Sequence, residues 1–194
     1  MAGHYEVMKV LVITVLLASP ALASECPEAP DHSVRLAELV EEVRDAKNEM
    51  YAAPLNTQMW ELWTDAPDEA AQEILNRGMR KRGSFDLLGA RADFDTLVDY
   101  CPEYAEGYNQ RAFINFMRND YEPAIADLTR ALELSPTHTG ALTGRALSYY
   151  ALGRLKEARA DLEVALGLNP WLPERHMLSD PAMKGQQEPK GDDL

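Results

Sequence analysis

The sequence predicts an all-α protein built as a solenoid of repeated helical hairpins. A period of 34 residues is visible along the chain, with Ala112 recurring as Ala146 and Pro136 recurring as Pro170. Apolar residues within each unit are spaced by three, four and seven, which is the pattern of a helix with one buried face. Each proline stands where the second helix of a unit should end. One such hairpin cannot bury its apolar face alone, so neighbouring hairpins are expected to stack.

Three units can be aligned in this way, at about 71–104, 105–138 and 139–170, and the first matches least well. Small residues occupy two fixed positions in every unit. Because the distance between packed helices depends on the side chains at the contact, we expect the two helices of a unit to cross there. The pairs are Gly78 with Ala90, Ala112 with Ala124, and Ala146 with Ala158.

Arginine and aspartate recur with the same period. Because a basic and an acidic residue recur together, we favour a structural ion pair that joins the two helices of each unit. The alternative is a row of arginines that binds an acidic partner. The residues are Arg77, Arg111 and Arg145, and Asp93, Asp127 and Asp161.

The period, the small residues at two offsets and the proline near the end of each unit resemble the tetratricopeptide repeat (TPR) family, which has two helices per repeat. This resemblance implies that the first helix of each repeat lines a concave groove. An apolar and aromatic floor with two amides suits an extended or helical peptide. The alternative is that Phe113, Phe116 and Met117 serve only in packing. The predicted groove residues are Leu75, Met79, Arg82, Asn109, Gln110, Phe113, Phe116, Met117, Thr143, Leu147 and Tyr150.

Some members of the TPR family hold the C-terminal carboxylate of a chaperone with lysine, asparagine and arginine side chains. The matching positions here do not carry that set, so we expect this clamp to be absent. They are Leu75, Met79, Gln110, Gly140 and Gly144.

Residues 1–23 have the features of a secretory signal peptide, with a short apolar run followed by a small-x-small motif. The run is too short to span a bilayer. We expect cleavage between Ala23 and Ser24 and a bacterial, periplasmic location; an uncleaved membrane anchor is the alternative. Met1 and Met8 are alternative translation starts, because the residues before Met8 fit poorly in the charged start of a signal peptide.

Cys26 and Cys101 are the only cysteines. An even number in an exported protein favours a disulfide, and two free thiols are the alternative. The bridge would close a loop of about 75 residues, for which the chain-entropy argument gives roughly 4 kcal/mol of stabilisation. A catalytic redox pair is less favoured, because no Cys-x-x-Cys spacing is present.

Segment 24–66 is predicted to be a helical hairpin that caps the solenoid. An apolar stripe over 36–50 indicates its first helix, and Pro54 is expected to break the chain before the second. Trp60 and Trp63 lie on one face of that second helix. We expect them to seal the open end of the first repeat, as terminal units of a solenoid do; the alternative is a pair that stacks on a ligand.

Two further segments flank the repeat helices. Four basic residues cluster near the end of a helix, where cations complement the helix dipole, and they are also a candidate contact for an acidic partner or a lipid headgroup: Arg77, Arg80, Lys81 and Arg82. Segment 171–194 is predicted to form a short cap and a disordered tail. Trp171 is expected to cover the last repeat helix, and the tail to begin at Ser179.

The composition is that of a soluble globular protein, with 46% hydrophobic and 26% charged residues. The formal net charge of −13 argues against nucleic acid and anionic membranes as partners. His32, His138 and His176 are far apart and expected outside the repeat interiors. No Gly-x-Ser-x-Gly motif or phosphate loop is present, so we expect no catalytic residues, metal, cofactor or small-molecule substrate.

The leading hypothesis is therefore a non-enzymatic, periplasmic TPR adaptor or scaffold that binds a protein or peptide through its groove. The alternatives are a structural subunit of a cell-envelope assembly and, less favoured, a redox-responsive adaptor that uses its two cysteines.

Overall fold

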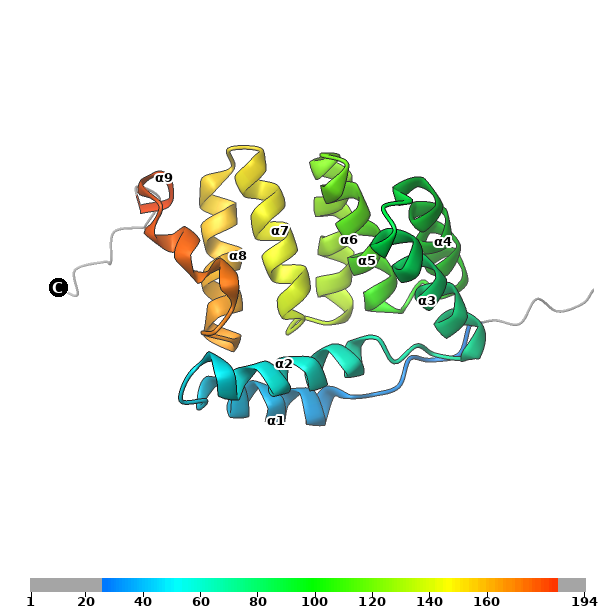
Figure 1. The fold of residues 1–194 in the computed structure, drawn as a ribbon, viewed down its shortest axis with the longest axis horizontal. Coiled ribbons are helices and arrows are strands. Elements are labelled where there is room, and N and C mark those ends of the chain that lie inside the picture. The colour runs from blue at the N-terminus through cyan, green and yellow to red at the C-terminus, as the bar shows by residue number, and fades with distance from the viewer. Residues whose placement is uncertain (1–25, 185–194) are drawn as a thin grey trace, which may run out of the picture.

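The computed structural model describes residues 26–184, and all regular secondary structure in that range is helical (Figure 1). The predicted signal peptide lies outside the described residues. Within 26–184, no helix has the length and apolar character needed to cross a membrane. In chain order the helices are α1 (Ser33–Arg44), α2 (Glu49–Trp63), α3 (Glu69–Gly83), α4 (Leu87–Tyr100), α5 (Ala105–Met117), α6 (Tyr121–Leu134), α7 (Thr139–Ala151), α8 (Leu155–Leu168), the 3-10 helix η1 (Pro173–Ser179) and α9 (Pro181–Lys184).

Helices α3 to α8 form three antiparallel pairs that stack side by side (Figure 1). Ala112 and Ala124 are fully buried in one core cluster between α5 and α6. In the first pair, a Cβ atom at Gly78 would lie 2.5 Å from the ring of Phe94, so only glycine fits there. The small residues thus allow the close helix contacts that the sequence predicted, and the predicted all-α repeat fold is confirmed.

The recurring arginines and aspartates form one ion pair in each helical hairpin. Each pair joins the first helix of a hairpin to the second, which confirms the structural interpretation. The nitrogen–oxygen distances are 2.9 Å for Arg77 with Asp93, 2.9 and 2.6 Å for Arg111 with Asp127, and 2.7 and 2.8 Å for Arg145 with Asp161.

The turns within the three hairpins share one backbone conformation. Phe85, Asn119 and Gly153 occupy the same place in each turn and have φ angles of 61°, 62° and 73°. In every turn the amide of this residue donates to a carbonyl three residues back, and the next amide donates to a carbonyl five residues back. This is the Schellman motif, which satisfies the last carbonyls of a helix and normally places glycine or asparagine in the left-handed position. Phe85 is therefore an exception.

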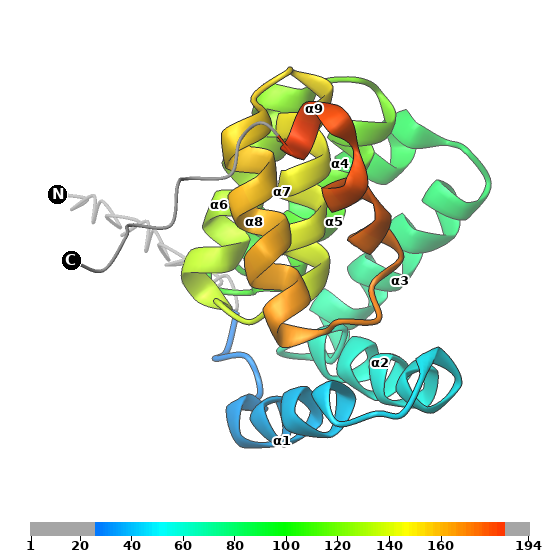
Figure 2. The same cartoon turned by 90° about the vertical axis from the view of Figure 1, so that its left-hand side faces the viewer.

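The α1–α2 hairpin lies across the ends of the repeat helices, where Figure 2 shows it below α8. Leu168 at the end of α8 packs against the core of this hairpin. The indole nitrogen of Trp171 donates to the carbonyl of Val43 at 3.1 Å, so Trp171 holds the end of α1, a contact that the sequence did not predict. The prediction that the tryptophan hairpin seals the open end of the first repeat is wrong, since the apolar face of the hairpin packs against Leu168 at the end of the last repeat.

The break between α1 and α2 occurs at Asn48 and not at Pro54 as predicted. The Asn48 side chain accepts a hydrogen bond from the backbone amide of Met50 at 3.0 Å and caps α2. Pro54 lies inside α2, close enough to its start that few intrahelical hydrogen bonds precede it. A good capping residue thus outweighed the proline, and Met50 is 82% exposed instead of extending the apolar stripe of α1.

Cys26 and Cys101 form a disulfide with their Cα atoms 5.2 Å apart. The bond ties the segment that precedes α1 to the end of α4. The hairpin is therefore attached to the first repeat covalently and to the last repeat by packing.

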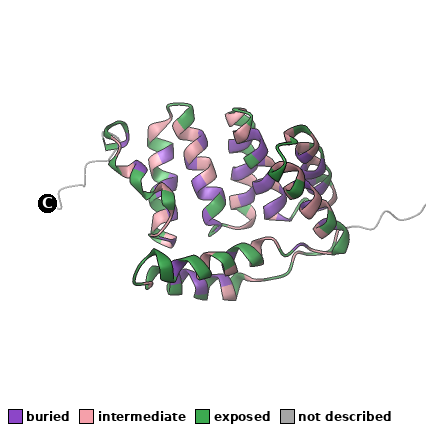
Figure 3. Cartoon of the chain, in the orientation of Figure 1, coloured by how far each residue is buried: buried purple, intermediate pink, exposed green. Residues whose placement is uncertain are grey.

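The C-terminal segment is ordered further than predicted. Met177 of η1 and Met183 of α9 are buried in one cluster with residues of α7 and α8, and Figure 3 shows this end of the molecule by burial. The prediction of disorder from Ser179 is therefore wrong for 179–184, because Met183 adds apolar area to the core of the last repeat. The prediction for 185–194 lies outside the described residues.

Candidate functional site

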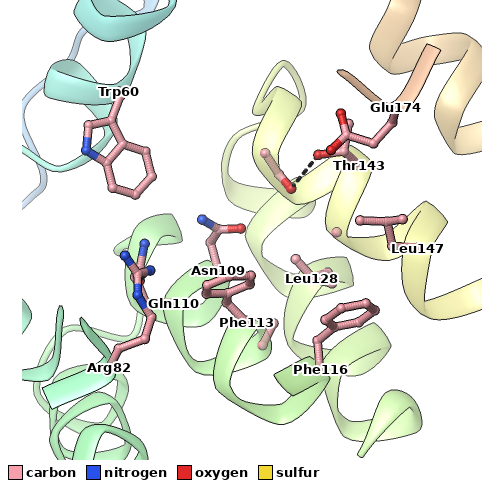
Figure 4. A pocket seen from close by; sticks show the side chains of 13 residues that line it. Trp60, Arg82, Asn109, Gln110, Phe113, Phe116, Leu128, Thr143, Leu147 and Glu174 are labelled. Carbon is pink, nitrogen blue, oxygen red and sulfur yellow. Dashed lines mark hydrogen bonds between the residues drawn. The ribbon is translucent and has the colours of Figure 1, made fainter. Parts of the chain in front are cut away.

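A pocket of about 350 Å³ lies between the first helices of the repeats and the α1–α2 hairpin (Figure 4). Its size lies within the range of pockets that hold a small ligand or a few peptide side chains. The predicted groove residues that line it are Arg82, Asn109, Gln110, Phe113, Phe116, Thr143 and Leu147.

Four predicted groove residues do not line this pocket. Leu75 is fully buried and Met79 packs against the same core cluster, because the first repeat uses them to fill the space around α4. Met117 is absent from the lining. The hydroxyl of Tyr150 donates to Asp180 at 2.6 Å, so this side chain is covered by the segment between η1 and α9.

Several lining residues were not predicted. Trp60 of α2 and Glu174 of η1 come from segments outside the repeat, so the 34-residue period gave no signal for them. Gly140 and Gly144 on α7 also line the pocket, and their missing side chains leave space there. Trp60 is 37% exposed and lies at the edge of the pocket in Figure 4, so α2 contributes a wall to a site that is otherwise built mainly by the repeat helices.

A network of hydrogen-bonded polar side chains lies beneath the pocket. Arg82 donates a hydrogen bond to the amide oxygen of Gln110, and the amide nitrogen of Gln110 donates to Glu106. Glu106 also accepts hydrogen bonds from Asn109 at 3.0 Å and from His138 at 2.8 Å. Glu106 and His138 are 1% and 0% exposed. The buried carboxylate therefore has three donors, as such a group requires.

His138 has a structural role in this network. Its Nδ1 atom accepts the backbone amide of Ala141 at 3.2 Å and caps α7. The proton must then be on Nε2, which donates to Glu106. Trp63 stacks on the imidazole with ring centroids 4.1 Å apart. The expectation that His138 lies outside the repeat interiors is wrong, and Trp63 stacks on this protein side chain while Trp60 faces the pocket.

Arg82 is the positive group of the pocket. Its guanidinium lies 5.0 Å from the ring centroid of Phe113. Burial lowers the pKa of Arg82, and the negative charge of Glu106 opposes that shift. Within residues 26–184, no carboxylate oxygen lies within 4.0 Å of its guanidinium nitrogens. The site therefore combines apolar surface with a cation that has no direct counter-charge in the described part of the chain.

Comparison with known proteins identifies the repeat. A family model described as Tetratricopeptide repeat matches residues 116–178. Residues 116–178 of this chain therefore match the TPR family. The Tetratricopeptide repeat protein 36 homolog of Nematostella vectensis is 38% identical over 71 residues, which are 37% of this chain and 39% of that protein. A TPR repeat-containing protein of Rhizobium etli is 31% identical over 108 residues, 56% of this chain and 45% of that protein. The chain thus spans less than half the length of these relatives.

Solved TPR domains have the same fold. The Arabidopsis OM64 TPR domain has a TM-score of 0.56 at 23% identity and covers 61% of this chain and 95% of that domain. The second TPR domain of human RPAP3, solved in complex with an HSP70 peptide, has a TM-score of 0.54 at 22% identity, covering 61% and 96%. At these identities the likeness concerns the fold of the TPR region.

Proposed function

We propose that this TPR protein is a non-enzymatic adaptor that binds a peptide segment of another protein in the pocket between α5, α7 and the α1–α2 hairpin. The observation that carries the proposal is Phe113, whose ring is 46% exposed inside a concave apolar site of a folded protein. Aromatic side chains held open in a pocket supply much of the free energy of peptide binding.

The polar groups of the site favour binding over catalysis. Glu106 and His138, the most obvious acid–base pair, face each other beneath the pocket and are fully buried. His138 also uses its second nitrogen to cap α7, so neither nitrogen is available to a substrate. General acid–base catalysis needs a group within hydrogen-bond reach of the reacting atoms.

The fold supports a peptide as the class of ligand. The RPAP3 domain with the same fold is described in complex with an HSP70 peptide. Fold alone does not transfer the ligand, and the clamp positions differ, because Gly140 and Gly144 carry no side chain and Leu75 is buried. We therefore propose a peptide ligand held without the chaperone-type clamp.

The test is selection of random linear dodecapeptides on the full-length, oxidised protein, followed by affinity measurement with synthetic peptides. Phe113→Ala should weaken the selected peptides about tenfold or more, since burying a phenylalanine ring gives about 1.5–3 kcal/mol. The control is Phe85→Ala, which removes a 77% exposed ring outside the pocket lining and should leave the affinity unchanged. Failure to enrich any peptide, or equal affinity for the wild type and Phe113→Ala, would refute the proposal.

We also propose that the chain is exported to the bacterial periplasm. The sequence motif at residues 1–23 and a disulfide at Cys26 support this, because disulfides persist in oxidising compartments. Intact mass spectrometry of the protein from its own cells should give a mass that begins at Ser24 and no thiol before reduction. A full-length mass with two free thiols would contradict export.

A further inference from the structure

The two ends of the pocket carry opposite charges, and this points to a dipolar ligand. We propose that the bound peptide places a carboxylate side chain on Arg82 and a basic side chain on Glu174, with an aromatic or branched aliphatic side chain between them. This inference rests on the proposed peptide-binding function and specifies the chemistry of its ligand.

Arg82 differs from the periodic arginines of the same chain. Arg77, Arg111 and Arg145 each pair with an aspartate, whereas the hydrogen bond that Arg82 makes within residues 26–184 goes to the neutral amide of Gln110. A partly buried guanidinium is stabilised by a carboxylate, which it can hold through two parallel hydrogen bonds. Its position over Phe113 leaves it at the pocket, where Figure 4 shows it on the side of Phe113.

Glu174 provides the opposite charge. It comes from η1, lines the same pocket and lies on the side away from Arg82 in Figure 4. Its neighbour Arg175 pairs with Glu49 of α2 at 3.0 Å and is thereby committed elsewhere. In the described part of the chain, Glu174 has no basic nitrogen within 4.0 Å. A ligand cation at this point would be attracted by an otherwise unpaired carboxylate.

The surface between the two charges is largely apolar. Phe113 and Phe116 on α5 and Leu147 on α7 provide aromatic and aliphatic area, and Gly144 leaves room in front of Leu128. This arrangement is complementary to one large apolar side chain flanked by an acidic and a basic residue. A ligand in the reverse orientation would place like charges together, which is unfavourable and therefore selects one direction of binding.

The alternative role of Arg82 is that of a counter-charge for the buried Glu106, which it reaches through Gln110. This role makes a different prediction. If Arg82 only compensates Glu106, its replacement lowers stability but leaves the charge preference of the bound peptides unchanged. Peptide selectivity therefore separates the two roles.

The experiment is peptide selection on the wild type, Arg82→Gln and Glu174→Gln, each checked for folding by circular dichroism. Wild-type selection should enrich an acidic and a basic residue on either side of an apolar one. Arg82→Gln should lose the acidic preference and Glu174→Gln the basic one. Matched controls are Arg80→Gln and Glu73→Gln, which change exposed residues of α3 and should keep the wild-type pattern.

A double-mutant cycle gives the decisive measurement. For a selected peptide, replacing its acidic residue by glutamine should weaken binding to the wild type about 10- to 100-fold, as expected for a charge-assisted hydrogen bond. The same replacement should have little effect on binding to Arg82→Gln, and Arg82→Lys should restore part of the difference.

Four outcomes would overturn the inference. Peptides that depend on Phe113 but show no charge pattern would refute it while leaving the proposed function intact. If replacing the acidic residue of the peptide weakened binding to the wild type and to Arg82→Gln equally, Arg82 would serve only as a counter-charge for Glu106. Full displacement of the peptides by a mixture of free amino acids at millimolar concentration would indicate a small zwitterion as the ligand. No enriched peptide at all would refute the proposed function as well.

Discussion

Phe85 is the residue whose replacement should stabilise this protein. It has a φ of 61° in the turn between α3 and α4, where the other two hairpins have Asn119 and Gly153. Its side chain is 77% exposed, so the ring gains little from packing. The three turns share the same hydrogen-bond pattern and therefore allow a comparison within one chain.

The expected gain from Phe85→Gly follows from two opposing terms. A left-handed conformation costs a residue with a Cβ atom about 1–2 kcal/mol, and glycine avoids this cost. Glycine also has more conformational freedom in the unfolded chain, which destabilises the folded protein by about 0.5–1 kcal/mol. The net stabilisation is about 0.5–1 kcal/mol, which corresponds to a rise in Tm of about 1–4 °C for a protein of this size.

The assay is thermal and urea unfolding of the oxidised, full-length protein followed by circular dichroism. The matched variant is Gly153→Ala, because a Cβ atom added there meets no heavy atom within 4 Å and its cost is that of the backbone alone. Gly153→Ala should lose about 1 kcal/mol. A Phe85→Gly protein less stable than the wild type, or a Gly153→Ala protein of unchanged stability, would refute the reasoning.

Three other perturbations have defined outcomes. Replacing Cys26 and Cys101 together by serine should lower the free energy of unfolding by up to about 4 kcal/mol, and reductant should have the same effect on the wild type but none on the variant in urea unfolding. Asp68 accepts the Ala71 amide at 2.8 Å and the Tyr100 hydroxyl at 2.6 Å; the backbone hydrogen bond and then the Tyr100 bond hold the pKa of Asp68 below its ordinary value. Because the folded pKa is below the unfolded one, the contribution is present above about pH 4 and is lost as pH falls through the folded pKa. Asp68→Asn should therefore remove part of the acid sensitivity of unfolding between about pH 4 and pH 2, and an unchanged pH profile would contradict this. Trp63→Ala removes the ring stacked on His138. It should lower the free energy of unfolding by about 3 kcal/mol and should also weaken the binding of selected acidic peptides. The control is Tyr51→Ala, which changes a 58% exposed residue on the same helix and should alter neither stability nor affinity.

The repeats could be predicted from the sequence because each repeat supplies the evidence for the others. Gly78 and Ala112 occupy equivalent positions in successive repeats, where the close contact of two helices requires a small residue. The ion pair of Arg111 with Asp127 could be predicted on the same basis, since both partners recur together. A residue that recurs at the same position of every repeat thus predicts a packing contact that is also repeated.

The position of the α1–α2 hairpin could not be predicted in this way. Its contacts join residues far apart in the chain, such as Asn56 with Asn169, which are hydrogen-bonded at 2.8 Å and separated by 113 positions. None of these residues recurs with the repeat, so the sequence offered no second example of the contact. For the same reason Trp60 and Glu174 were missed as lining residues, while Phe113 and Leu147, which lie on the repeat helices, were found.

The buried carboxylate of Glu106 connects the hairpin to the pocket. On one side it holds His138, against which Trp63 of α2 stacks, and on the other it orients Gln110, which holds Arg82. A buried charge is tolerated only when all its donors are in place, so removal of any one of them leaves an unsatisfied group that costs about 1–3 kcal/mol. The docking of the hairpin and the orientation of the pocket cation are therefore coupled through a single side chain. The hairpin that carries Trp60 to the pocket wall is thus attached at Cys26, at Trp171 and through this network.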